Sequence, residues 1–83
     1  MFFDVVSVGL NSKPATDETM KLVRKLTKLQ HLDLAAAQKV TNEGLKQLEG
    51  LDHMTYLRLD GTSVTDDAIR EYQRTHANVE VVR

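Results

Sequence analysis

Apolar residues recur along this chain at two different spacings, which alternate with each other. Leu32 and Leu34 are separated by one polar residue, and Leu57 and Leu59 repeat that arrangement. A period of two is typical of a strand with one buried face. Elsewhere the apolar residues recur every third residue, which is typical of a helix with one buried side. The series with helical spacing are Met20, Val23 and Leu26, then Leu45, Leu48 and Leu51, then Ile69 and Tyr72.

A threonine stands ahead of each helical series, at Thr16, Thr41 and Thr65. The hydroxyl of a threonine at this place accepts a hydrogen bond from an unpaired N–H of the first turn. Acidic residues follow, where the helix dipole favours negative charge: these are Asp17, Glu18, Glu43, Asp66 and Asp67. We therefore expect helices over residues 16–28, 41–50 and 65–75, and strands over residues 4–8, 31–34, 56–59 and 79–82.

The chain also matches itself at a fixed period. Residues 29–34, LQHLDL, recur 25 residues later as MTYLRL, and FDVVSV at residues 3–8 fits the same frame. Each of these segments is followed by a second shared segment, which reads ATDETM, VTNEGL or VTDDAI. Self-similarity at a period of roughly 20–50 residues indicates a repeat architecture. We expect a single domain over residues 1–83, with repeats over residues 3–28, 29–53 and 54–78 and a terminal strand over residues 79–82.

Strands that alternate with helices and run in one direction form a parallel sheet with the helices on one face. A helix is wider than the step between two strands, so the sheet is expected to curve. The predicted fold is α/β, a short right-handed solenoid with a parallel sheet of about four strands on the concave side and three helices on the convex side. Its expected core contains Leu32, Leu34, Leu45, Leu48, Leu57, Leu59 and Ile69.

These segments resemble leucine-rich repeat proteins, in particular the cysteine-containing subclass found in F-box proteins and in bacterial repeat proteins. Residues 29–48 and 54–72 fit the subclass pattern of spaced leucines followed by a Thr-Asp pair. Three residues differ from the usual pattern: Ala37 and Thr62 stand where the family usually has Cys or Asn, and Asn42 replaces the Asp. The resemblance implies a non-enzymatic scaffold that binds other proteins.

The residues between the buried leucines should point away from the helices, because side chains alternate along a strand. Aligning the repeats places Val5, His31, Tyr56 and Asn78 in one column, and Ser7, Asp33, Arg58 and Glu80 in the next. The predicted partner-binding residues are His31, Asp33, Tyr56, Arg58, Asn78 and Glu80. Tyr and Arg are enriched at binding hot spots. The alternative is that Asp33, Arg58 and Glu80 form an acid–base–acid ladder, in which the three charges pair with one another and bind no partner.

Composition and motifs narrow the chemistry further. Eleven basic and 12 acidic residues give a net charge of −1, which argues against a dedicated nucleic-acid or membrane binder. Without cysteine there is no thiolate metal site, and the three histidines show no zinc spacing. No nucleophile or phosphate-binding motif appears, so we expect neither catalysis nor a cofactor. Four cations fall on one face of the first predicted helix: Lys21, Arg24, Lys25 and Lys28. A phosphate-binding site is one interpretation, but we favour a solvated outer face, which every helix of this fold needs.

Two expectations concern location and assembly. The N-terminal residues lack the positive start of a signal peptide and no apolar run is long enough to span a membrane, which favours the cytoplasm. The alternative function is a structural or oligomerising piece of a longer solenoid that acts through its open ends. The outer strands, around residues 5–8 and 79–82, would leave backbone groups unpaired and invite a second copy. Leu22 takes a place that is polar in the other repeats, so it should be exposed at one end.

Overall fold

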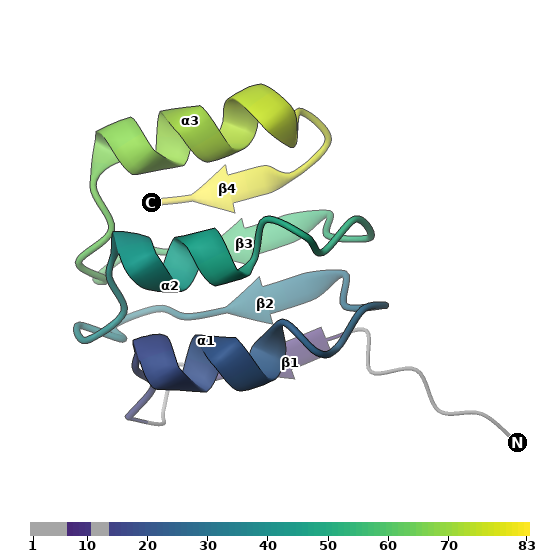
Figure 1. Ribbon diagram of the computed structural model, residues 1–83. Coiled ribbons are helices and arrows are strands. Elements are labelled where there is room, and N and C mark those ends of the chain that lie inside the picture. The colour runs from purple at the N-terminus through teal and green to yellow at the C-terminus, as the bar shows by residue number, and fades with distance from the viewer. Residues whose placement is uncertain (1–6, 11–13) are drawn as a thin grey trace, which may run out of the picture.

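A computed structural model of the protein describes residues 7–10 and 14–83, and over these residues three helices cover one face of a four-stranded sheet (Figure 1). The strands are parallel and adjacent in chain order, as predicted. Residues 4–6 of the first predicted strand lie outside the described residues. In chain order, the elements are β1 (Ser7–Gly9), α1 (Asp17–Val23), β2 (His31–Asp33), α2 (Asn42–Gln47), β3 (Tyr56–Arg58), α3 (Asp66–Thr75) and β4 (Glu80–Val82).

The helices begin where the sequence places them, but the first two end earlier. Thr16, Thr41 and Thr65 are the N-caps, and the hydroxyl of each accepts an N–H of the first turn. After α1 the backbone forms tighter turns, in which Leu26 N–H donates to the Val23 carbonyl at 2.9 Å. Such turns shorten the helix and return the chain to the sheet. The predicted helices over residues 16–28 and 41–50 are therefore too long, whereas α3 matches its prediction closely.

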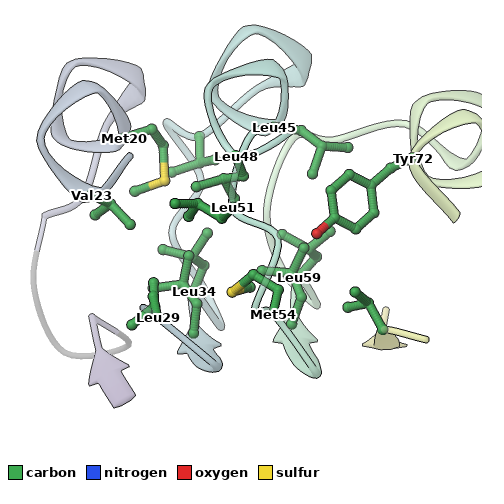
Figure 2. Packing of buried hydrophobic residues seen from close by; sticks show 14 of the residues in the cluster. Met20, Val23, Leu29, Leu34, Leu45, Leu48, Leu51, Met54, Leu59 and Tyr72 are labelled. Atoms are coloured by element: carbon green, nitrogen blue, oxygen red, sulfur yellow. The ribbon is translucent and has the colours of Figure 1, made fainter. Parts of the chain in front are cut away.

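The core fills the space between the helices and the sheet (Figure 2). All seven predicted core residues are buried. They are joined by side chains from both layers, including Met20, Leu29, Met54 and Tyr72. Among the described residues, no charged side chain is buried. Burial of this apolar surface is what holds the two layers together, at roughly 25 cal/mol per Å² removed from water.

The register across the two central strands is as predicted, but it is wrong by two residues at both outer strands. His31 pairs with Tyr56 and Asp33 with Arg58. On the outer strands, Ser7 lies beside His31 and Glu80 lies beside Tyr56. The positions given to Val5 and Asn78 therefore belong to Ser7 and Glu80, and Val5 itself lies outside the described residues.

The shift at β4 has a local cause in the turn that precedes it. Val79 N–H donates to the His76 carbonyl at 3.1 Å, and the Val79 side chain is buried just ahead of the strand. Leu29 and Met54 are buried ahead of β2 and β3 in the same way. Val81 is then the residue that pairs with Leu57.

Side chains also join the start of each helix to the start of the next one. Asp17 Oδ1 accepts the backbone N–H of Thr41 at 2.8 Å, and its Oδ2 accepts the Thr41 hydroxyl at 2.6 Å. Asn42 Oδ1 accepts the backbone N–H of Thr65 at 2.9 Å. These acidic and amide residues therefore do more than favour the helix dipole, because they hold neighbouring helix starts at a fixed separation.

Candidate binding face

The face of the sheet opposite the helices, called here the open sheet face, carries most of the predicted binding residues. Leu32 and Leu57 are fully buried under the helices. Because side chains alternate along a strand, their neighbours point to the other face. His31 is exposed there, and Asp33, Tyr56 and Arg58 are half-buried.

An aromatic pair lies at the centre of this face. The rings of His31 and Tyr56, which come from paired positions on β2 and β3, have centroids 6.2 Å apart and planes inclined by 58°. This spacing is within the range of favourable edge-to-face contacts. The pair presents a partly apolar surface to solvent, with the charged residues Asp33, Arg58 and Glu80 on neighbouring strand positions.

Arg58 is held by a residue that the sequence analysis did not identify. Its Nε donates to Asp60 Oδ1 at 2.6 Å and its Nη2 donates to Asp60 Oδ2 at 3.3 Å. This hydrogen-bonded pairing lowers the pKa of Asp60 and raises that of Arg58. The predicted ladder of Asp33, Arg58 and Glu80 is therefore wrong, because Arg58 pairs within its own segment and Glu80 lies beside Tyr56.

Asp33 is positioned by the turn that follows its strand. Its Oδ1 accepts the backbone N–H of Ala35 at 3.0 Å, which fixes the carboxylate at the end of β2. The side chain lies next to Arg58 in register, and its charge contributes to the raised pKa of Arg58. An aspartate and an arginine are thus set side by side on the open sheet face, each held by its own turn.

The two predicted residues from the C-terminal segment are separated. Glu80 is on β4 and exposed, and its backbone N–H donates to the Thr55 carbonyl at 2.9 Å. Asn78 lies in the turn between α3 and β4, so it is not part of the strand column in which we placed it. Five of the six predicted residues therefore share the open sheet face, and Asp60 joins them.

Sequence reasoning also missed a brace between the ends of α2 and α3. His76 Nε2 lies 2.8 Å from the Glu49 carbonyl oxygen, and its ring stacks on Tyr72 with centroids 4.2 Å apart. Tyr72 is buried, and in the described part of the chain its hydroxyl has no hydrogen-bond partner. Burial raises the pKa of Tyr72 to about 12, with a further contribution from the charge of Glu49. No local signal in the sequence connects His76 to Glu49, because 27 positions separate them.

A hollow of about 520 Å³ lies between α2 and α3, and its lining is rich in acidic residues. Three of these four acids are already paired on their own helices: Glu43 with Lys46 at 3.5 Å, Asp67 with Arg70, and Glu71 with Arg74. Across residues 7–10 and 14–83, no three histidine or acidic side chains gather as metal ligands would. The hollow therefore offers no set of unpaired charges for a cation.

The four cations predicted on the first helix are all exposed, but only Lys21 lies within α1, because the helix ends at Val23 and Lys25 and Lys28 lie in the turns that follow it. Lys21 pairs with Glu18 at 3.0 Å, and Arg24 Nη1 donates to Gln47 Oε1 at 2.8 Å. Two of the four cations are thus engaged within the molecule, which favours the interpretation of a solvated face.

In the part of the chain that the structure describes, no helix has the length and apolar character needed to cross a bilayer.

Comparisons with known proteins give no relative from which a function can be transferred. No protein-family model matches the chain, and no curated protein matches it significantly. The functional argument therefore rests on the residues of the open sheet face.

Proposed function

We propose that this chain is a leucine-rich-repeat-like recognition module that binds a partner protein through the open sheet face, which would be the concave side of a short solenoid. The role is one of binding and not of catalysis. The observation that carries the proposal is the arrangement of Tyr56 and Arg58, an aromatic ring and a positioned guanidinium on neighbouring sites of one strand. Tyrosine and arginine are the residue types over-represented among binding hot spots.

The way Arg58 is held supports this role. Asp60 binds the guanidinium through two of its nitrogens, so the side chain is ordered before any partner arrives. An ordered side chain loses less conformational entropy on binding than a free one, and this raises affinity without a new contact. The His31–Tyr56 pair adds a second element with few rotatable bonds.

The experiment is an affinity capture with the immobilised chain and three variants. Tyr56→Ala and Arg58→Glu change the open sheet face, whereas a double Lys25→Glu and Lys28→Glu variant changes charge on the helix side. A partner that uses the proposed face is recovered by the unmodified chain and the helix-side variant, and is lost from the other two. Circular dichroism spectra of all four chains should agree. A partner lost only from the helix-side variant would move the binding site to the turns that follow α1.

A further inference from the structure

The charges of the open sheet face do not balance. Among the described residues that β2, β3, β4 and the turn after β3 place there, the carboxylates of Asp33, Asp60 and Glu80 stand against the guanidinium of Arg58. Asp60 binds that guanidinium through two hydrogen bonds, so the Arg58–Asp60 pair adds no net charge to the face. The two charges that remain, on Asp33 and Glu80, are both negative.

Neither of these two carboxylates has an ion-pair partner of its own in the described part of the chain. Asp33 Oδ1 accepts the Ala35 N–H, which fixes the carboxylate, and no described residue donates to its Oδ2. Arg58 lies beside Asp33 in register, but its Nε and Nη2 donate to Asp60. The Glu80 side chain is exposed. Both carboxylates can therefore accept a cation from a partner.

Tyr56 lies between the two charges. Glu80 is its paired neighbour on β4, and Asp33 is diagonal to it on β2 (Figure 1). Two strand steps and two residues separate Asp33 from Glu80, which places their Cα atoms about 12 Å apart. The Tyr56 ring is half-buried, so part of it is open to a partner. A cation over an aromatic ring is attracted by the ring itself, and here also by the carboxylates beside it.

This arrangement suits arginine better than lysine. A guanidinium is planar, stacks on an aromatic ring and pairs with a carboxylate through two N–H groups, whereas an ammonium is a strongly hydrated point charge. Arg58 does not oppose such a partner, because Asp60 neutralises it. No described residue accepts from Arg58 Nη1, so this nitrogen can donate to a backbone carbonyl of the partner.

We propose that the partner of the open sheet face is a basic, arginine-containing protein segment. One arginine stacks on Tyr56 and pairs with Glu80, a second cation pairs with Asp33, and Arg58 donates to a backbone carbonyl of the segment. In an extended segment, side chains four residues apart point to one side and are separated by about 13 Å, which matches the separation of Asp33 and Glu80. The inference rests on the proposed function, since it gives the chemistry of the partner that the same face binds.

Selection from a random peptide library displayed on phage tests the inference without assuming a partner. Peptides that bind the immobilised chain and are lost from Tyr56→Ala define the ligands of the open sheet face, and they should be enriched in arginine. A double Asp33→Arg and Glu80→Arg variant should recover acidic peptides instead. A double Glu49→Arg and Glu71→Arg variant makes the same change of charge in the hollow between α2 and α3. It is the matched control, and it should still recover the arginine-containing peptides.

The tightest of these peptides allows a direct measurement by fluorescence polarisation. A double Asp33→Asn and Glu80→Gln variant should bind it about tenfold more weakly, as expected for the loss of two exposed ion pairs. A double Glu49→Gln and Glu71→Gln variant should bind it as the unmodified chain does. Added salt should weaken the binding, because it screens exposed charges. Lysine in place of the peptide's arginines should weaken binding to the unmodified chain and make little difference to Tyr56→Ala.

The outcomes separate this inference from the proposed function. Peptides that depend on Tyr56 but show no excess of basic residues would overturn the inference and leave the proposed function standing. Basic peptides whose affinity is unchanged in the Asp33→Asn and Glu80→Gln variant would overturn it as well, because the attraction would then come from another part of the molecule. If no recovered peptide depends on Tyr56, the open sheet face is not a binding site and the proposed function fails too. Circular dichroism spectra of all variants should agree with that of the unmodified chain.

Discussion

Asp17 and Thr41 are joined by two hydrogen bonds across the starts of α1 and α2, one to the backbone N–H and one to the hydroxyl of Thr41. A single carboxylate thereby satisfies a backbone donor that the cap of α2 leaves open and fixes the distance between two helices. Asn42 makes the corresponding contact with Thr65. The link gives Asp17 and Asn42, each of which follows a capping threonine, a role beyond any effect on the helix dipole.

Replacing Asp17 with alanine should lower the free energy of unfolding by about 2 kcal/mol, because a charge-assisted hydrogen bond contributes roughly 1.5–3 kcal/mol. Asp17→Asn should cost much less, since an amide oxygen can still accept the Thr41 N–H. Urea denaturation followed by circular dichroism measures both changes. Equal losses for the two variants would mean that the charge at the helix start matters and the link does not.

Gly44→Ala should destabilise the protein, although alanine normally favours a helix over glycine by roughly 0.5–1 kcal/mol. A Cβ at Gly44 would lie 2.5 Å from Asp17 Oδ1 and 3.0 Å from Met20 Cγ, so it would push the carboxylate away from Thr41. Gly50→Ala is the matched control, because no atom lies within 4 Å of a Cβ built there. In thermal unfolding, the midpoint should fall for Gly44→Ala and stay level or rise for Gly50→Ala. A higher midpoint for Gly44→Ala would contradict the close approach of α1 and α2.

The turns at Ala36 and Gly61 lie against each other, and substitutions in them should change the free energy of unfolding in opposite directions. Ala36 has φ of 64° and Gly61 has φ of 79°, and a Cβ at Gly61 would lie 2.9 Å from the Ala36 backbone. Left-handed backbone costs alanine about 1 kcal/mol and costs glycine almost nothing. Ala36→Gly should therefore raise the free energy of unfolding by up to about 1 kcal/mol, whereas Gly61→Ala should lower it by more than that. Chemical denaturation of the two variants beside the unmodified chain checks the signs, and a stabilising Gly61→Ala would refute this description of the turns.

Tyr72 should make the protein sensitive to alkaline pH. Its pKa is raised to about 12 in the folded chain, and in an unfolded chain tyrosine has a pKa of about 10. Ionisation of Tyr72 therefore costs no stability below about pH 10, and the folded state loses stability as the pH rises from about 10 through about 12. Absorbance titration of a Tyr56→Phe variant follows the ionisation of Tyr72 alone, because the chain has two tyrosines.

Removing the hydroxyl gives the control for this alkaline effect. Tyr72→Phe should abolish the part of the pH dependence that Tyr72 causes. At neutral pH it should also stabilise the protein by about 1 kcal/mol, because a buried unpaired hydroxyl costs roughly 1–3 kcal/mol. A loss of stability in Tyr72→Phe at pH 7 would show that the hydroxyl has a partner in solution.

The alternation of strands and helices could be predicted from the sequence because it follows from which side chains are buried. The central register follows from the 25-residue repeat of LQHLDL as MTYLRL, which sets Leu32 beside Leu57. At β4 the sequence allows two registers, because Val79 and Val81 are two residues apart and either one could be the buried residue of the strand. The observed register follows from the turn that buries Val79 ahead of the strand, and this turn depends on packing against the rest of the core.

The candidate site could be predicted only in part, for a related reason. His31 and Tyr56 follow from strand alternation, which is a local property. The partner of Arg58 could not be predicted in this way, because Asp60 reaches the guanidinium only through the conformation of the chain after β3. Likewise, the link from Asp17 to Thr41 depends on two helices being brought together by the sheet beneath them.

The most direct test of the proposed function is the dissociation constant for the partner that the unmodified chain captures. Isothermal titration should give a value that Tyr56→Ala weakens by about 30-fold, as expected for a hot-spot residue worth roughly 2 kcal/mol. The double Lys25→Glu and Lys28→Glu variant should bind as the unmodified chain does. Unchanged affinity in Tyr56→Ala and in Arg58→Glu would contradict binding through the open sheet face.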